Sequence, residues 1–266
     1  MSRYFLGFHA CLILFALVLV ALEVGRQLGK YHAKRNAATG KGDISTGVIE
    51  GAVFGLMGLF LAFFFSGAYT RFDVRRNLIT TEMIAIKNAY LQADLLDTTS
   101  ANLVHREIRD YLHDRIMYYE VFSTNFPLAN QYLLQSKKIQ LKLWQDTITN
   151  SNPNSSRVNA ALLAMINAAD IRMITMHIHP PMVIFYLFLT MSIVSALLAG
   201  YNIGGKKAGS PIHMIVYALL MAFTIYLTID MEYPRSGFLT NINSFDYFLA
   251  HALDNSDLPT PTNDKS

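Results

Sequence analysis

The chain has 266 residues, of which 52% are apolar and only 15% are charged, and its formal net charge is +3. Soluble domains carry roughly 25% charged residues, so the composition argues against an ordinary soluble protein. The small net charge, with no basic and aromatic surface, argues against nucleic-acid binding. Cys11 is the single cysteine, which excludes an intrachain disulfide.

The apolar residues are bunched into four runs without formal charge, each about 19 residues or longer, as a helix that crosses a bilayer requires. The runs are residues 4–22, 51–70, 180–205 and 211–229. In lipid every backbone amide must be paired internally, so such runs must be helices. The first run is too long for a secretory signal, and no small-residue cleavage site follows it. We therefore predict an all-α polytopic membrane protein with four transmembrane helices and a central extramembrane helical region.

The first helix is expected to continue past its apolar run to Lys30, before a polar loop at 36–43. The second helix is expected to begin near Ser45. No glycine or proline interrupts residues 71–96, and apolar residues recur there at helical spacing. One long helix is therefore predicted to leave the membrane and continue in water.

The central region shows the start signals of further helices. Asp97-Thr-Thr-Ser100 is typical of a helix N-cap. Pro127 suits the first turn of the next helix, where its missing N–H has no intrahelical partner. A loop at 150–156 precedes another helix at 158–177, and Pro180-Pro181 marks the entry to the third membrane helix.

These elements predict five segments along the chain. They are a first transmembrane hairpin at 1–70, an extramembrane helical domain at 71–179, a second transmembrane hairpin at 180–230, a post-membrane elbow and short helix at 231–253, and a disordered tail at 254–266. Four spans place both termini and the central domain on one side of the bilayer. The basic residues near the membrane are divided evenly between the two sides, but the short loops alone favour cytoplasmic hairpin loops.

One face of the second membrane helix carries Gly51, Gly55, Leu59 and Phe63, which are spaced by four. Small residues at this spacing let helix backbones approach closely, so helix packing is one interpretation. The other is that this face lines a narrow hydrophobic constriction, which can gate a pore by dewetting. Composition does not distinguish phenylalanines that face lipid from those that face a lumen.

A charge cluster of Arg71, Asp73, Arg75 and Arg76 follows where the second helix leaves the membrane. Such a cluster can anchor the helix, because long basic side chains extend to the headgroup layer. Alternatively it forms an electropositive vestibule that concentrates anions.

A compact motif, Asp230-Met-Glu-Tyr-Pro-Arg-Ser-Gly237, follows the fourth apolar run. Its proline and glycine favour a rigid elbow, and Arg235 can pair with an acid across it. Two acids, Asp230 and Glu232, are only a weak signal for a hard cation, so no metal site is predicted.

The nucleophile elbow, zinc-protease and phosphate-loop motifs are absent. We therefore expect no catalytic residues, no cofactor and no enzymatic activity.

Four stretches across residues 23–237 carry a family resemblance. They are Glu23-x-Gly-x-x-x-Gly29; Leu61-Ala-Phe-Phe-Phe-Ser66; Arg71-Phe-Asp-x-Arg-Arg76 continuing into Glu82-Met-Ile-Ala-Ile-Lys-Asn-Ala-Tyr-Leu91; and the motif from Asp230 to Gly237. In these stretches the chain resembles the bestrophin-like integral membrane family, long labelled a domain of unknown function. The family-motif residues are Glu82, Asp230, Pro234, Arg235 and Gly237. The chain departs from the family's usual residues between Glu82 and Ala85 and between Asp230 and Pro234.

Ala68-Tyr69-Thr70-Arg71-Phe72 is more distantly similar to the second-helix exit of true bestrophins, which are pentameric anion channels. This resemblance implies a pore neck at Gly55, Leu59 and Phe63 and a homo-oligomer, pentameric by analogy, that conducts small anions. It also implies a cytoplasmic central domain and location in a bacterial inner membrane. Gly55 stands where bestrophins favour a large apolar residue, and their acidic calcium clasp has no match.

Two functions in a lipid bilayer follow from these features; a membrane enzyme ranks third, because it would need clustered polar residues facing a cavity, which the sequence does not show clearly. One is an oligomeric anion channel whose pore is lined by the second transmembrane helix. The other is a non-conducting membrane scaffold or sensor that binds a partner through its central helices. The channel requires a ring with the second helices inward, whereas the scaffold requires no axial opening.

The resemblance and the short-loop charges give opposite topologies, which labelling can distinguish. In a Cys11→Ser background, we expect Lys207→Cys to react with a membrane-impermeant thiol reagent added outside intact cells. Thr149→Cys is expected to react only after the cells are opened, because the central helices are expected in the cytoplasm. The reverse pattern would contradict the topology that the resemblance implies.

Overall fold

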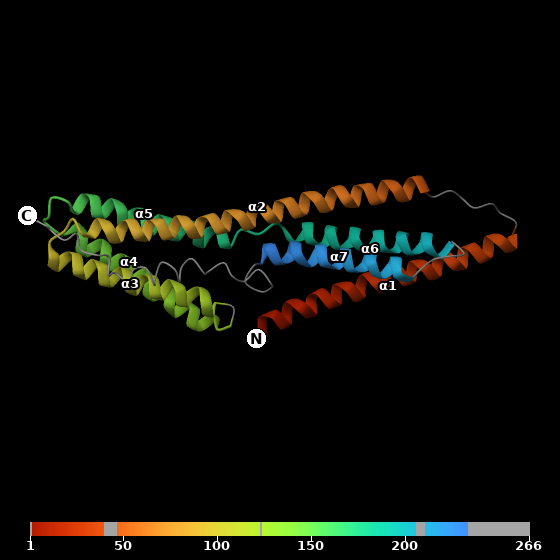
Figure 1. Ribbon diagram of the computed structural model, residues 1–266, viewed down its shortest axis with the longest axis horizontal. Coiled ribbons are helices and arrows are strands. Elements are labelled where there is room, and N and C mark those ends of the chain that lie inside the picture. The colour runs from red at the N-terminus through yellow and green to blue at the C-terminus, as the bar shows by residue number, and fades with distance from the viewer. Residues whose placement is uncertain (1, 40–46, 123, 206–210, 234–266) are drawn as a thin grey trace, which may run out of the picture. The chain divides into compact units, whose positions relative to one another are not determined.

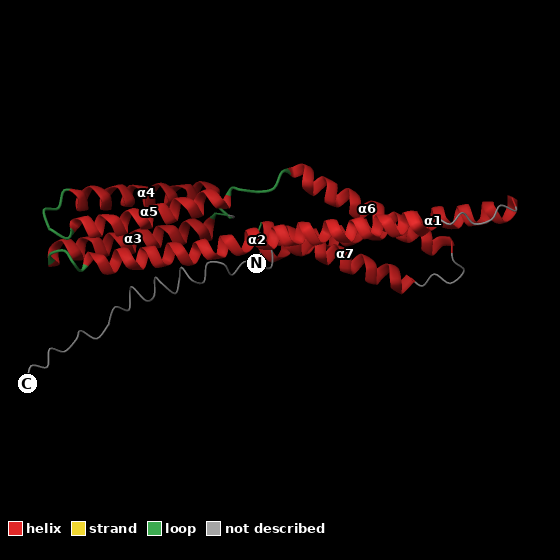
Figure 2. Cartoon of the chain, turned by 90° about the horizontal axis from the view of Figure 1, so that it is seen from above, coloured by secondary structure: helices red, strands yellow, loops and turns green. Residues whose placement is uncertain are grey.

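The structure is a computed structural model that describes residues 2–39, 47–122, 124–205 and 211–233. These residues form seven α-helices, and Figure 2 shows no strand among them. The helices are α1 (Ser2–Thr39), α2 (Gly47–Ala93), α3 (Thr98–Val121), α4 (Phe126–Ile148), α5 (Ser155–Met176), α6 (Met182–Gly205) and α7 (Pro211–Glu232). The predicted all-α class is confirmed, and the second helix is the single long helix that the sequence predicts.

By length and composition, five helices can cross a membrane, one more than predicted. Four of them, α1, α2, α6 and α7, contain the charge-free runs. The fifth is α5, which is the least apolar of the five. It was not among the predicted spans because Arg157, Asp170 and Arg172 interrupt its apolar residues.

The described residues separate into two compact units, each with its own core. The first unit holds the residues up to Phe72 and those from His179 onward, and the second holds Asp73–Ile178. The helix α2 contributes its first part to one unit and its second part to the other.

In the first unit, α1 and α6 approach so closely that their backbones touch (Figure 1). The contact is made by two glycines on each helix, spaced by four: Gly25 and Gly29 on α1, and Gly200 and Gly204 on α6. A Cβ atom on Gly25 would lie 2.0 Å from the carbonyl oxygen of Leu197. No side chain fits at that distance, so the close approach requires glycine.

The glycine contact continues into an apolar core shared by α1, α6 and α7. Val18 and Leu22 of α1, Ala196 of α6 and Ala218 of α7 are almost completely buried within it. The membrane part of α2 joins the unit through a separate cluster, in which Phe64 stacks on Phe188 with ring centroids 4.7 Å apart. One face of α2 is therefore anchored by aromatic packing.

The second unit consists of α3, α4, α5 and the second part of α2, which run side by side in Figures 1 and 2. Its core takes residues from all four helices, among them Ile86, Ile108, Leu143 and Met165. As predicted, Asp97 caps α3: its carboxylate accepts a hydrogen bond from the Ser100 backbone N–H, which also holds the pKa of Asp97 below its ordinary value. Pro127 lies in the first turn of α4, also as predicted.

The glycine contact predicts that replacing a glycine by alanine lowers stability at the α1–α6 contact but not at an uncovered position of a membrane helix. We expect Gly200→Ala to destabilise the protein by about 1–3 kcal/mol or more, because the added methyl group overlaps the carbonyl oxygen of Leu22. Thermal unfolding of the detergent-purified protein measures the effect. Gly58→Ala is the control, since a Cβ there has no neighbour within 4 Å, and an equal loss for both variants would contradict the prediction.

Candidate functional site

The predicted pore-lining residues lie on the face of α2 that the other described helices leave uncovered. Gly51 and Gly55 are exposed, and a Cβ atom added to either glycine has no neighbour within 4 Å. Leu59 and Phe63 are 55% and 69% exposed. These four residues therefore do not pack against another described helix of the same chain, so their neighbours are lipid, a second copy of the chain or a water-filled lumen.

Where α2 leaves the apolar bundle, Arg71 forms an ion pair within the first unit. Its Nε donates to Oε2 of Glu232 at 2.8 Å, and the Glu232 side chain is only 1% exposed. Nδ1 of His179 lies 3.3 Å from the other carboxylate oxygen of Glu232, and the His179 ring stacks on Tyr233. One buried carboxylate thus links α2, α7 and the segment that enters α6.

The other three members of the predicted charge cluster belong to the second unit. Arg75 is buried and donates from Nη2 to the carbonyl oxygen of Ile178 at 3.1 Å. Asp73 accepts a hydrogen bond from the Asn77 side chain at 3.2 Å, one turn along the helix. Arg76 is exposed. Arg71 and Arg75 therefore each bind another segment of their own unit.

The two acids nearest the membrane boundaries are both buried. Glu50 is 5% exposed and accepts a hydrogen bond from the side-chain amide of Asn202 on α6. Asp230, near the end of α7, is 4% exposed. The remaining motif residues, Pro234, Arg235 and Gly237, lie outside the described residues.

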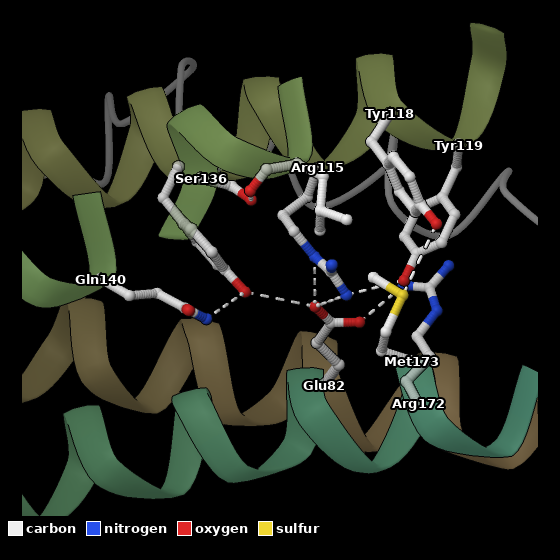
Figure 3. Close-up of polar contacts among 10 residues, drawn as sticks. Glu82, Arg115, Tyr118, Tyr119, Ser136, Gln140, Arg172 and Met173 are labelled. Carbon is white, nitrogen blue, oxygen red and sulfur yellow. Dashed lines mark hydrogen bonds and ion pairs between the residues drawn. The ribbon is translucent and has the colours of Figure 1, made fainter. Parts of the chain in front are cut away.

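Glu82, the motif residue on the second part of α2, is the centre of a buried ionic cluster (Figure 3). One carboxylate oxygen accepts from Nε of Arg115 on α3 at 2.9 Å, and the other accepts from Nη1 of Arg172 on α5 at 2.7 Å. All three side chains are at most 5% exposed. A single carboxylate therefore ties three helices of the second unit together.

Aromatic and amide side chains complete the surroundings of this cluster. The Tyr119 ring lies 3.9 Å from the guanidinium of Arg172, and its hydroxyl accepts a 2.6 Å hydrogen bond from Arg115. The Tyr111 hydroxyl donates to Glu82 and accepts from the Gln140 amide. Burial raises the pKa of Tyr111, so its phenol stays neutral and able to donate.

Glu82 belongs to a sequence motif, whereas neither of the arginines that bind it does. One sequence feature could have indicated that Arg115 is buried: it lies within an otherwise apolar stripe of its helix. Arg115 lies four residues after Tyr111 and four before Tyr119, both of which are buried. Pairing each arginine with Glu82 required the tertiary fold, because 33 and 90 residues separate the partners.

The described residues contain no group of three or more histidine, cysteine or acidic side chains placed to hold a metal ion. Among the buried carboxylates, Glu82 and Glu232 are bound by arginines and Glu50 by an amide. These buried ion pairs and hydrogen bonds hold the helices that they join in fixed positions.

Comparison with known proteins identifies the fold. The structure is similar to two variants of a bacterial bestrophin homologue from Klebsiella pneumoniae. For the first, the TM-score is 0.69 at 15% identity, over 94% of this chain and 99% of that one. For the second, the TM-score is 0.64 at 14% identity, over 90% and 97%. No family model and no curated protein sequence matches the chain.

These findings define the class of protein. The apolar helices make it an integral membrane protein, and its fold is that of the bacterial bestrophin homologues. The resemblance to bestrophins that the sequence motifs indicate is thus confirmed at the level of the fold.

The Glu82 cluster predicts a large loss of stability for a small chemical change. Glu82→Gln removes the negative charge between two buried guanidinium groups, so we expect it to lower the unfolding free energy by about 3–5 kcal/mol. Circular dichroism during thermal or denaturant unfolding in detergent measures this loss. Asp94→Asn is the control: Asp94 is 61% exposed beside His105, and exposed pairs contribute roughly 0–1 kcal/mol. Equal losses would contradict the central role of Glu82.

Proposed function

We propose that the protein is an oligomeric channel for small anions whose pore is lined by the uncovered face of α2. The observation that carries the proposal is that Gly51, Gly55, Leu59 and Phe63 are exposed on a helix whose opposite face is packed. By the resemblance, the assembly is a homo-oligomeric ring, pentameric by analogy, in a bacterial inner membrane with its central domain in the cytoplasm.

The two faces of α2 support a lining role for this helix. Met57 and Phe64 are buried against α6 and α7, which holds the helix in a definite orientation. Leu59 and Phe63 are then presented away from the bundle, where copies around an axis would form apolar rings. Apolar rings of this kind can gate a pore by dewetting.

The charges at the α2 exit contribute to this channel mainly by holding the helix. Arg71 is paired with Glu232, and Arg75 is buried beside the Ile178 carbonyl. In the proposed channel, these contacts keep the pore-lining helix attached to α7 and to the end of α5. Arg76, the third arginine of the cluster, is exposed.

Current measurements on purified protein in planar bilayers test the channel. We expect the wild type to conduct chloride, and Phe63→Ala or Leu59→Ala to raise the single-channel conductance, because a smaller side chain widens the apolar constriction and eases wetting.

Phe223→Ala is the matched control for this experiment. Phe223 is 55% exposed on α7, so the same substitution removes an uncovered phenylalanine that is not in the proposed pore. Its conductance should equal that of the wild type. Absence of current, or equal conductance in all four proteins, would reject the channel.

One observation favours the alternative, a non-conducting scaffold or sensor that binds a partner through its central helices. On α4, Leu134, Leu141 and Ile148 are 52%, 63% and 56% exposed and are spaced by seven. A row of this kind can pack against a partner helix. Light scattering separates the two functions, since the scaffold predicts a monomer or dimer and the channel predicts a larger ring.

A further inference from the structure

A groove of about 750 Å³ lies within the second unit, between α2 and α5. From α2 it is lined by Thr81, Asn88 and Gln92, among others, and α5 contributes a row of alanines that ends at Arg157. The small alanine side chains leave the space open. The groove therefore lies along the same helix, α2, that is proposed to line the pore in the membrane.

The chemistry of this groove suits an anion. Arginine, asparagine, glutamine and threonine side chains can all donate hydrogen bonds to an anion, and no carboxylate is among the lining residues. A second groove, between α3 and α4, is different, because Asp110 and Asp114 line it together with Lys138. Of these two grooves, the α2–α5 groove has a positively charged side chain in its lining and no negatively charged one.

Arg157 also differs from the arginines that the fold uses for its own stability. Arg71 is paired with Glu232, and both Arg115 and Arg172 are paired with Glu82. The Arg157 side chain is exposed and forms no ion pair with another residue of the described chain. Its guanidinium is free to attract a mobile ion, and its replacement leaves no buried charge without a partner.

We propose that the α2–α5 groove is the anion-attracting part of the conduction pathway outside the membrane, and that Arg157 sets the preference for small inorganic anions over cations. The proposal rests on the pore proposed for α2. A fixed cation in an acid-free groove raises the local concentration of anions and lowers that of cations. In a ring, each copy of the chain adds one such guanidinium to the pathway.

The test is the reversal potential of the full-length protein in planar bilayers under a potassium chloride gradient. Arg157→Glu should lower the chloride-to-potassium permeability ratio by about tenfold, the lower end of the effect that a charged lining has on local ion concentration. Arg157→Gln should lower it less, and Arg157→Lys should keep the wild-type ratio because the charge remains. Gel filtration establishes that each variant assembles as the wild type does.

Lys138→Glu is the control, because it makes the same change of charge in the α3–α4 groove and should leave the ratio unchanged. Wild-type ratios in Arg157→Glu and Arg157→Gln, with normal current, would overturn the role of Arg157 while leaving the α2 pore intact. An equal fall in Lys138→Glu would also overturn it, since the effect would then reflect net charge alone. Absence of current in the wild type would instead overturn the pore itself, and this inference with it.

Discussion

The contact between the backbones of α1 and α6 is the constraint on which the first unit depends. Two glycines on each helix let the two backbones touch, so the helices meet at a distance that only glycine permits. Lipid supplies little hydrophobic drive for helix association, and close packing must take its place. With α7 packed on the same core, α2 is left to attach by its Met57 and Phe64 face, which leaves its other face uncovered.

The second unit depends on a different interaction, the buried carboxylate of Glu82. Hydrophobic packing of α2, α3 and α5 tolerates small shifts along the helix axes, but an ion pair in a dry interior does not. A shift that separated Glu82 from Arg115 or Arg172 would leave a buried charge without its partner. The cluster therefore favours one register for three helices. The Glu82 cluster contributes more to the choice of this register than to net stability, because the cost of desolvating the charges offsets much of their attraction.

Charged residues in this chain consequently have two distinct uses. Those at helix junctions, such as Arg71 with Glu232, are paired or buried and hold segments together. Arg157, in contrast, is exposed beside a groove without carboxylates, where its field acts on ions in solution. The proposed channel needs both: paired charges to hold α2 in place, and an unpaired charge to attract anions.

The sequence by itself determined the features that depend on local physics. Charge-free runs predict membrane helices, an uninterrupted stretch after Arg71 predicts the long α2, and Asp97 predicts a helix start. Spacing by four also placed Gly51 and Phe63 on one face. Only the tertiary structure decided which side of α2 is covered, that Gly25 meets Leu197, and that Glu82 binds Arg115 and Arg172. Helical periodicity reports neighbours within about four residues, whereas these contacts join residues that are far apart in the chain.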